Sequence, residues 1–206
     1  MFGNRMLAPA RMIAGSWIHN GRPGRVKSPA MESEMAKDEA PNVGFTIYRA
    51  KDAPGLMEAA CMSIAPRTDI QAEGLKKVMA AGYGEGEQCK VLVSLPGFSL
   101  THAWMKTEYP LTLHSHDSDC LYFIVAGDLR LGTEELGPKD CFFVPAGVPY
   151  TYKPGPNGVE VLEFRHENQF NFVNFSKNAA FYDKAADTCA ANLETWRTAK
   201  PPSQMA

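Results

Sequence analysis

The chain has 206 residues and a formal net charge of −2, with 45% hydrophobic and 21% charged residues, a composition typical of a soluble globular protein. Residues 1–30 hold five basic and no acidic side chains, so the rest of the chain is acidic, which argues against a nucleic-acid partner. No apolar run reaches the roughly 20 residues of a membrane span. The five cysteines form no CxxC pair, which favours reduced thiols and predicts a cytoplasmic protein.

The N-terminal part is predicted to consist of a tail and of elements that precede the main domain. Residues 1–42 are rich in Gly, Pro, Ser and charge, and we predict a tail or an arm there. A transit peptide, or sequence that precedes a true start at Met31 or Met35, are the alternatives. Residues 43–87 are expected to supply a short strand and a helix that pack on the following domain. Thr68 is a suitable N-cap for a helix over 69–81, which Gly82 would end.

Residues 88–175 have the pattern of a β domain. Short apolar segments alternate with turn signals, which is typical of a sandwich or barrel. The predicted strands are 89–95, 99–106, 109–116, 121–126, 129–131, 140–144, 149–153 and 159–166. Residues 176–206 are predicted to form a C-terminal helix, about 178–198, and a tail. The apolar spacing of that helix predicts that it docks on the barrel or on a second subunit.

A histidine pair lies at the start of the predicted hairpin. His114 and His116 are two residues apart, so in a strand they point to the same face and can converge on one metal ion. The apolar run 121–125 follows, with a turn expected at 126–128. Such a pair also occurs by chance at polar strand ends, so its spacing leaves a metal site and a chance pair open.

Two incomplete motifs around this pair resemble those of the cupin superfamily. The first motif runs Gly, five residues, HxH, three or four residues, Glu, six residues, Gly. His114, His116 and Gly127 match it, whereas Glu108 stands at the first Gly position and Cys120 at the Glu position.

The second cupin motif runs Gly, five residues, Pro-x-Gly, two residues, His, three residues, Asn. Pro145 and Gly147 match it, whereas Lys139, Tyr150 and Pro154 replace the Gly, His and Asn. The two half-motifs occur in the family's order, about 30 residues apart, within 88–166. The resemblance therefore implies an all-β fold: a cupin-type jelly-roll β-barrel with an N-terminal arm and a C-terminal helix.

The resemblance also implies a range of functions. In the family, three His and one Glu commonly hold Fe, Mn, Ni or Zn inside a barrel that is often dimeric. Family members are dioxygenases, isomerases, lyases and decarboxylases, or they bind sugars and other small ligands without catalysis. The fold does not select among these functions.

The metal ligands expected here are His114, His116 and Cys120. A Cys120 thiolate would favour Zn or Fe(II), but Cys120 is equally interpretable as a small buried filler. His102 or His166 could replace the missing third histidine, and Tyr150 could fill the volume that a metal once needed. Thiol dioxygenases of the family also place Cys at this position, although they retain the third histidine.

Several other side chains are candidates for chemistry or ligand binding. Tyr122 and Tyr150 are the candidate proton donors or acceptors, each with aromatic packing as the alternative. Tyr152, His102 and Arg165 are the candidate ligand-binding residues, since Arg165 could grip a carboxylate.

The leading hypothesis is a metal-dependent cupin enzyme that acts on a small organic molecule. The alternatives are a metal-free cupin that binds a small ligand, and an interaction scaffold. Neither a nucleic acid nor a membrane is an expected partner. We predict a homodimer, because the edges and apolar outer faces of a barrel need cover.

Overall fold

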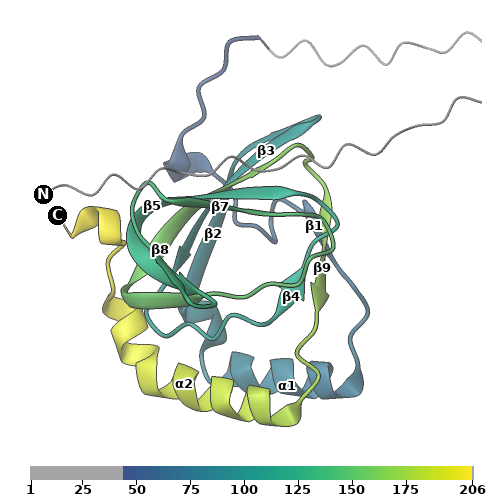
Figure 1. The fold of residues 1–206 in the computed structure, drawn as a ribbon, viewed down its shortest axis with the longest axis vertical. Coiled ribbons are helices and arrows are strands. Elements are labelled where there is room, and N and C mark those ends of the chain that lie inside the picture. The colour runs from purple at the N-terminus through teal and green to yellow at the C-terminus, as the bar shows by residue number, and fades with distance from the viewer. Residues whose placement is uncertain (1–43, 206) are drawn as a thin grey trace, which may run out of the picture. The chain divides into compact units, whose positions relative to one another are not determined.

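The computed structural model describes residues 44–205, all within the compact unit Glu39–Ala206. The predicted arm over 1–42 lies outside the described residues. Two β layers surround an interior, and two helices lie side by side across one end of them (Figure 1). The predicted fold class, a β domain followed by a C-terminal helix, is therefore confirmed.

The larger sheet has six strands in the order β2-β3-β8-β5-β6, and β7 also pairs with β5. The smaller sheet has the order β1-β9-β4, in which β1 and β9 are parallel. The strands are β1 (Met62–Ile64), β2 (Glu87–Leu95), β3 (Phe98–Met105), β4 (His114–Ser115), β5 (Cys120–Leu131), β6 (Glu134–Leu136), β7 (Cys141–Val144), β8 (Lys153–Arg165) and β9 (Phe170–Asn174). The helices are α1 (Asp69–Ala80) and α2 (Ala179–Thr198), with short 3-10 turns η1 (Ala50–Asp52), η2 (Tyr83–Glu85) and η3 (Pro202–Gln204).

Alternation along β5 shows how the sequence forms the larger sheet. Cys120, Tyr122 and Ile124 are buried, whereas Leu121 and Phe123 between them are exposed. A strand directs successive side chains to opposite faces, so the buried set lines the interior. In β8 burial is continuous over residues 158–161 instead of alternating, so both faces of this central strand are covered there.

Gly127 marks the clearest departure from the predicted strands. A turn was expected at 126–128, yet β5 continues through it as one strand that pairs with β8 on both sides. Gly127 has φ +74° at an irregularity in the register, and a Cβ atom there would lie 2.1 Å from the Gly158 carbonyl oxygen. Gly127 therefore lies in a β-bulge instead of a hairpin turn, and its lack of a side chain permits the close approach of the Gly158 backbone.

Other predicted boundaries also differ from the structure. Residues 45–49 form no strand, and the predicted strand 109–116 is reduced to β4. Within 149–153, Tyr150 forms an isolated bridge and Lys153 is the first residue of β8. Strands β6 and β9 were not predicted. The length of β8 exceeds the predicted 159–166 because β5 pairs with it as far as Lys153.

The two helices close one end of the barrel. Thr68 caps α1 in a capping box with Gln71, as its sequence predicts, and Asn178 caps α2. Gly74 of α1 admits the Tyr182 ring of α2, since a Cβ atom at Gly74 would lie 2.2 Å from that ring. Trp196 is fully buried and its indole N–H donates to the Thr107 carbonyl at 2.8 Å, which fixes the end of α2. The helix thus docks on its own barrel.

The structure also bears on the cysteines and on membrane-spanning segments. None of the five cysteines forms a disulfide. No helix within 44–205 has both the length and the apolar character needed to cross a bilayer.

Candidate functional site

A cavity of about 240 Å³ lies between the barrel interior and the two helices. Its walls come from α1, α2, both sheets and the loop before β4. Most of the lining is apolar or aromatic, and the polar side chains are concentrated on the strands. His114, His116, Tyr150, Tyr152 and Arg165 all line it, so the structure brings five of the predicted site residues together.

The histidine pair is positioned by backbone pairing between residues 114–116 and 147–150. His114 exchanges backbone hydrogen bonds with Tyr150, from N to O at 3.1 Å and from O to N at 2.9 Å. Gly147 donates its N–H to the His116 carbonyl at 2.7 Å, and it has φ +76°, a conformation that favours glycine. Residues 30 or more apart in sequence thus form one wall.

Each imidazole is held in one tautomer by a backbone carbonyl. Nδ1 of His114 lies 2.8 Å from the Thr112 oxygen, and Nδ1 of His116 lies 2.5 Å from the Asn171 oxygen. A carbonyl only accepts hydrogen bonds, so both Nδ1 atoms carry the proton and both Nε2 atoms keep a lone pair. The Phe172 ring stacks on His114 with centroids 4.9 Å apart.

Burial keeps both imidazoles neutral at physiological pH. It lowers the pKa of His114 to about 4, and it lowers the pKa of His116, which the Arg165 charge lowers further. A neutral imidazole with a free Nε2 can accept a hydrogen bond, coordinate a metal or take up a proton.

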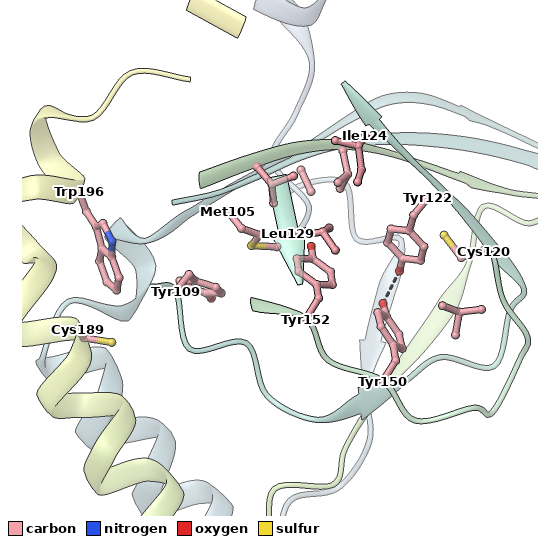
Figure 2. Close-up of a cluster of buried hydrophobic side chains, with 14 residues drawn as sticks. Met105, Tyr109, Cys120, Tyr122, Ile124, Leu129, Tyr150, Tyr152, Cys189 and Trp196 are labelled. Carbon is pink, nitrogen blue, oxygen red and sulfur yellow. Dashed lines mark hydrogen bonds between the residues drawn. The ribbon is translucent and has the colours of Figure 1, made fainter. Parts of the chain in front are cut away.

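A hydrogen-bond chain runs from the tyrosines to a buried ion pair. The hydroxyls of Tyr122 and Tyr150 bond to each other (Figure 2), and Arg165 donates from Nη2 to the Tyr122 hydroxyl at 3.4 Å. Arg165 also donates from Nη1 to Glu163 at 2.7 Å, and its guanidinium stacks over the Phe170 ring. Burial raises the pKa of both phenols, so they remain protonated.

Arg165 is almost fully buried yet remains charged. Burial is the largest single influence and acts to lower its pKa, but the adjacent Glu163 carboxylate together with Tyr122 and Cys120 outweighs burial, so the pKa is raised. Val161, Glu163 and Arg165 form the inward face of β8, and Glu163 and Arg165 line the cavity.

Cys120 lies beside Tyr122 in the buried core (Figure 2) and does not line the cavity. Burial raises the pKa of its thiol to about 12, so the thiol stays protonated at neutral pH. Cys120 is therefore outside the cavity wall that carries the two histidines.

The donor set does not fit the metal that the sequence predicted. Within 44–205, no three His, Cys, Asp or Glu side chains come together as metal ligands. The two Nε2 atoms are available, but the positions at which the resemblance expects the other ligands hold Tyr150, whose hydroxyl bonds to Tyr122, and Cys120, which does not line the cavity. Protein zinc sites usually use three or four protein ligands, so two imidazoles fall short of a complete set.

The two other candidate histidines lie outside the cavity. Alternation along β3 buries Thr101 and Ala103 and turns His102 outward, where its Nε2 lies 3.1 Å from Glu160. His166 is exposed beyond the end of β8, 3.6 Å from Glu167. Neither replaces the third histidine, and His102 does not line the cavity as a ligand-binding residue.

A second polar group on the cavity wall was missed from the sequence. Glu87 and Cys89 of β2 line the cavity, and the Cys89 thiol donates to the Glu87 carboxylate at 2.9 Å. Tyr83 and Tyr109 line the same side, with ring centroids 4.7 Å apart. The spacing of 87 and 89 on a strand was the available signal, but nothing in the sequence placed that face inward.

The chain was compared with known proteins. No protein-family model matches it, and no curated protein matches it. Similar solved structures include the polyketide cyclase RemF from Streptomyces resistomycificus, at 19% identity and TM-score 0.44 over 52% of this chain and 84% of that one. KdgF from a Halomonas species shares 19% identity, with TM-score 0.36 over 40% of this chain and 80% of that one. An RmlC-like cupin from Shewanella frigidimarina shares 20% identity, with TM-score 0.36 over 40% and 77%.

Proposed function

Because its fold and both of its half-motifs are of the cupin type, we propose that this protein binds a small, largely apolar organic molecule directly with its own side chains. The observation that carries the proposal is the pair of anchored, neutral imidazoles whose Nε2 lone pairs remain unused within an aromatic cavity. Ligand sites are commonly of this type, with apolar walls and a few placed polar groups.

The proposed ligand donates hydrogen bonds to the imidazoles. Nε2 of His114 and Nε2 of His116 are acceptors, so the matching ligand groups are O–H or N–H. Tyr150 is the proposed partner for a ligand acceptor, because its phenol stays protonated and its ring lies 4.4 Å from that of His114. Tyr122 and Arg165 act behind Tyr150 and position it, and Tyr152 completes the wall.

A metal-dependent cupin enzyme is the second candidate. It is favoured by the Nδ1 atoms, since metal-ligating histidines usually donate their other N–H to a carbonyl or carboxylate. The same anchoring serves a histidine that accepts a hydrogen bond from a ligand. The incomplete donor set makes direct binding the better supported function.

One set of variants separates the two candidates. The experiment measures metal content and the small molecules that co-purify in chelator-free buffer, for wild type, His114→Ala/His116→Ala and His102→Ala. We expect sub-stoichiometric metal that the double variant does not change, and an organic molecule that only the double variant loses. His102→Ala is the matched control because that histidine lies outside the cavity. About one transition metal per chain that disappears in the double variant would establish the second candidate.

We further propose that the protein forms a homodimer. The outer face of β5 exposes Leu121, Phe123 and Val125, and β7 adds Phe143, which is in register with Leu121. Contiguous apolar surface of this kind is characteristic of association sites, and a second copy of the chain would cover it. Light scattering that reports a 22.6 kDa species at micromolar concentration would contradict this proposal.

A further inference from the structure

Glu87 is the one carboxylate in the cavity that has no positive partner. Across the described part of the chain, every ion pair involves other acidic residues, and the hydrogen-bond donor to the Glu87 side chain is the Cys89 thiol. Glu163, the other carboxylate on the cavity wall, is neutralised by Arg165 at 2.7 Å. Arg67 also lines the cavity but is solvent-exposed, so water screens its charge.

The surroundings of Glu87 are aromatic. Tyr83, Tyr109 and Tyr152 line the same cavity, and Tyr109 also contacts Trp196 at a centroid distance of 6.1 Å. Aromatic faces attract cations, and a half-buried carboxylate without a positive partner in an apolar cavity is costly. A thiol is a weak donor and compensates that cost only in part.

From this arrangement we infer that the ligand carries a protonated amine, which binds between the Glu87 carboxylate and the surrounding tyrosine rings. The inference rests on the proposed function, because it names the chemical class of the molecule that occupies the same cavity. The apolar lining from β9 and α2 would receive the hydrocarbon part of such a molecule. An arylalkylamine has both features.

The titration of Glu87 gives this assignment a pH dependence that can be measured. Burial raises the pKa of the Glu87 carboxyl, the Cys89 thiol lowers it and the Glu163 charge raises it further. A bound ammonium would favour the ionised form, so amine affinity should weaken as pH falls and the carboxyl becomes protonated. The other titratable groups facing Glu87 are the Cys89 thiol and the phenols of Tyr83, Tyr109 and Tyr152, all of which burial keeps protonated.

The test compares three probes of similar shape, 2-phenylethylamine, 2-phenylethanol and phenylacetate, by NMR titration of the full chain. We expect the amine to bind about tenfold more tightly than the alcohol, since hydrogen bonds to charged groups contribute most, and phenylacetate to bind weakest. Glu87→Gln should remove the preference for the amine, and its loss of affinity toward about pH 5 should disappear with it. Glu85→Gln is the matched control, because Glu85 is exposed and does not line the cavity.

Each remaining outcome counts against the inference in a different way. Equal affinity for amine and alcohol, or an amine preference that persists in Glu87→Gln, would overturn the assignment and leave the proposed function intact. Tighter binding of phenylacetate would indicate that the arginines recognise the ligand through its carboxylate, and this result would also overturn the assignment. Binding of none of the probes would contradict both the assignment and the proposed function. Glu87→Asp, which keeps a carboxylate, should retain part of the preference and guards against an effect of misfolding.

Discussion

The cavity has two polar ends that respond to burial in opposite ways. At the His114–His116 end, burial favours the neutral imidazoles. Their Nδ1–H groups donate to backbone carbonyls, so each Nε2 atom is left as a hydrogen-bond acceptor. At the Glu87 end, burial opposes a negative charge that has a weak partner, so this end is incomplete without a ligand. Desolvation favours the neutral form of a titratable group. The histidines are uncharged in that form and require no counterion, whereas an ionised Glu87 carboxylate requires a cation to offset its desolvation.

The largest expected effect comes from removing Arg165. Arg165→Leu would leave Glu163 as an unpaired buried carboxylate. The histidine end would then also contain a carboxylate without a positive partner, as the Glu87 end does. We expect a loss of about 3–5 kcal/mol in the free energy of unfolding, measured by urea denaturation. The double variant Glu163→Gln/Arg165→Leu should recover much of that loss. A single variant as stable as wild type would mean that Glu163 finds another partner or becomes protonated.

A smaller effect is expected from the pH dependence of the histidine end. The folded pKa of His114 is about 4, below the ordinary histidine value of 6.5, so the unfolded state binds more protons between these values. Stability should therefore fall as pH drops from about 6.5 to about 4, by up to about 3 kcal/mol from this residue. In His114→Gln the slope of unfolding free energy against pH should flatten, while His102→Gln should leave it unchanged. An unchanged slope in His114→Gln would show that His114 is not buried as a neutral base.

The Glu87 end should show the opposite sign. Its carboxyl pKa is raised in the folded state, so the folded protein binds more protons than the unfolded chain just above the ordinary carboxyl range. The contribution of Glu87 to the free energy of unfolding therefore decreases as the pH rises through the range just above the ordinary carboxyl pKa. Chemical denaturation of Glu87→Gln, compared with Glu85→Gln, should show that this decline is lost. A decline that persists in Glu87→Gln must come from another group.

The smallest effect concerns Cys120, which belongs to neither end. Its thiol is buried and protonated, so it should be inert to thiol reagents in native protein, with or without chelator. Counting reactive thiols in wild type and Cys120→Ser isolates this residue from the other four. Chelator-dependent reactivity that Cys120→Ser abolishes would identify the thiolate ligand that the sequence allowed.

The sequence predicted the parts of this molecule that local patterns specify. The capping of α1 by Thr68, the extent of α2 and the inward histidine pair followed from residue spacing alone. Gly127 was misassigned because a glycine with positive φ serves a bulge and a turn equally, and only the partner strand distinguishes them. The sequence did not identify Glu87 as a cavity residue, and the expectation that His102 lines the cavity was wrong. Both follow because tertiary packing, and not the two-residue period of a strand, decides which face of the strand points inward.

Long-range 1H–15N spectra of the histidine side chains test the central claim most directly. On chelator-treated protein at pH 7, the account predicts that His114 and His116 are neutral with the proton on Nδ1, and that one equivalent of Zn²⁺ leaves their Nε2 resonances unchanged. Resonances can be assigned with His114→Gln and His116→Gln. Protonated imidazoles, a proton on Nε2, or a shift of both Nε2 resonances that saturates at one equivalent of Zn²⁺ would contradict a site that binds its ligand directly.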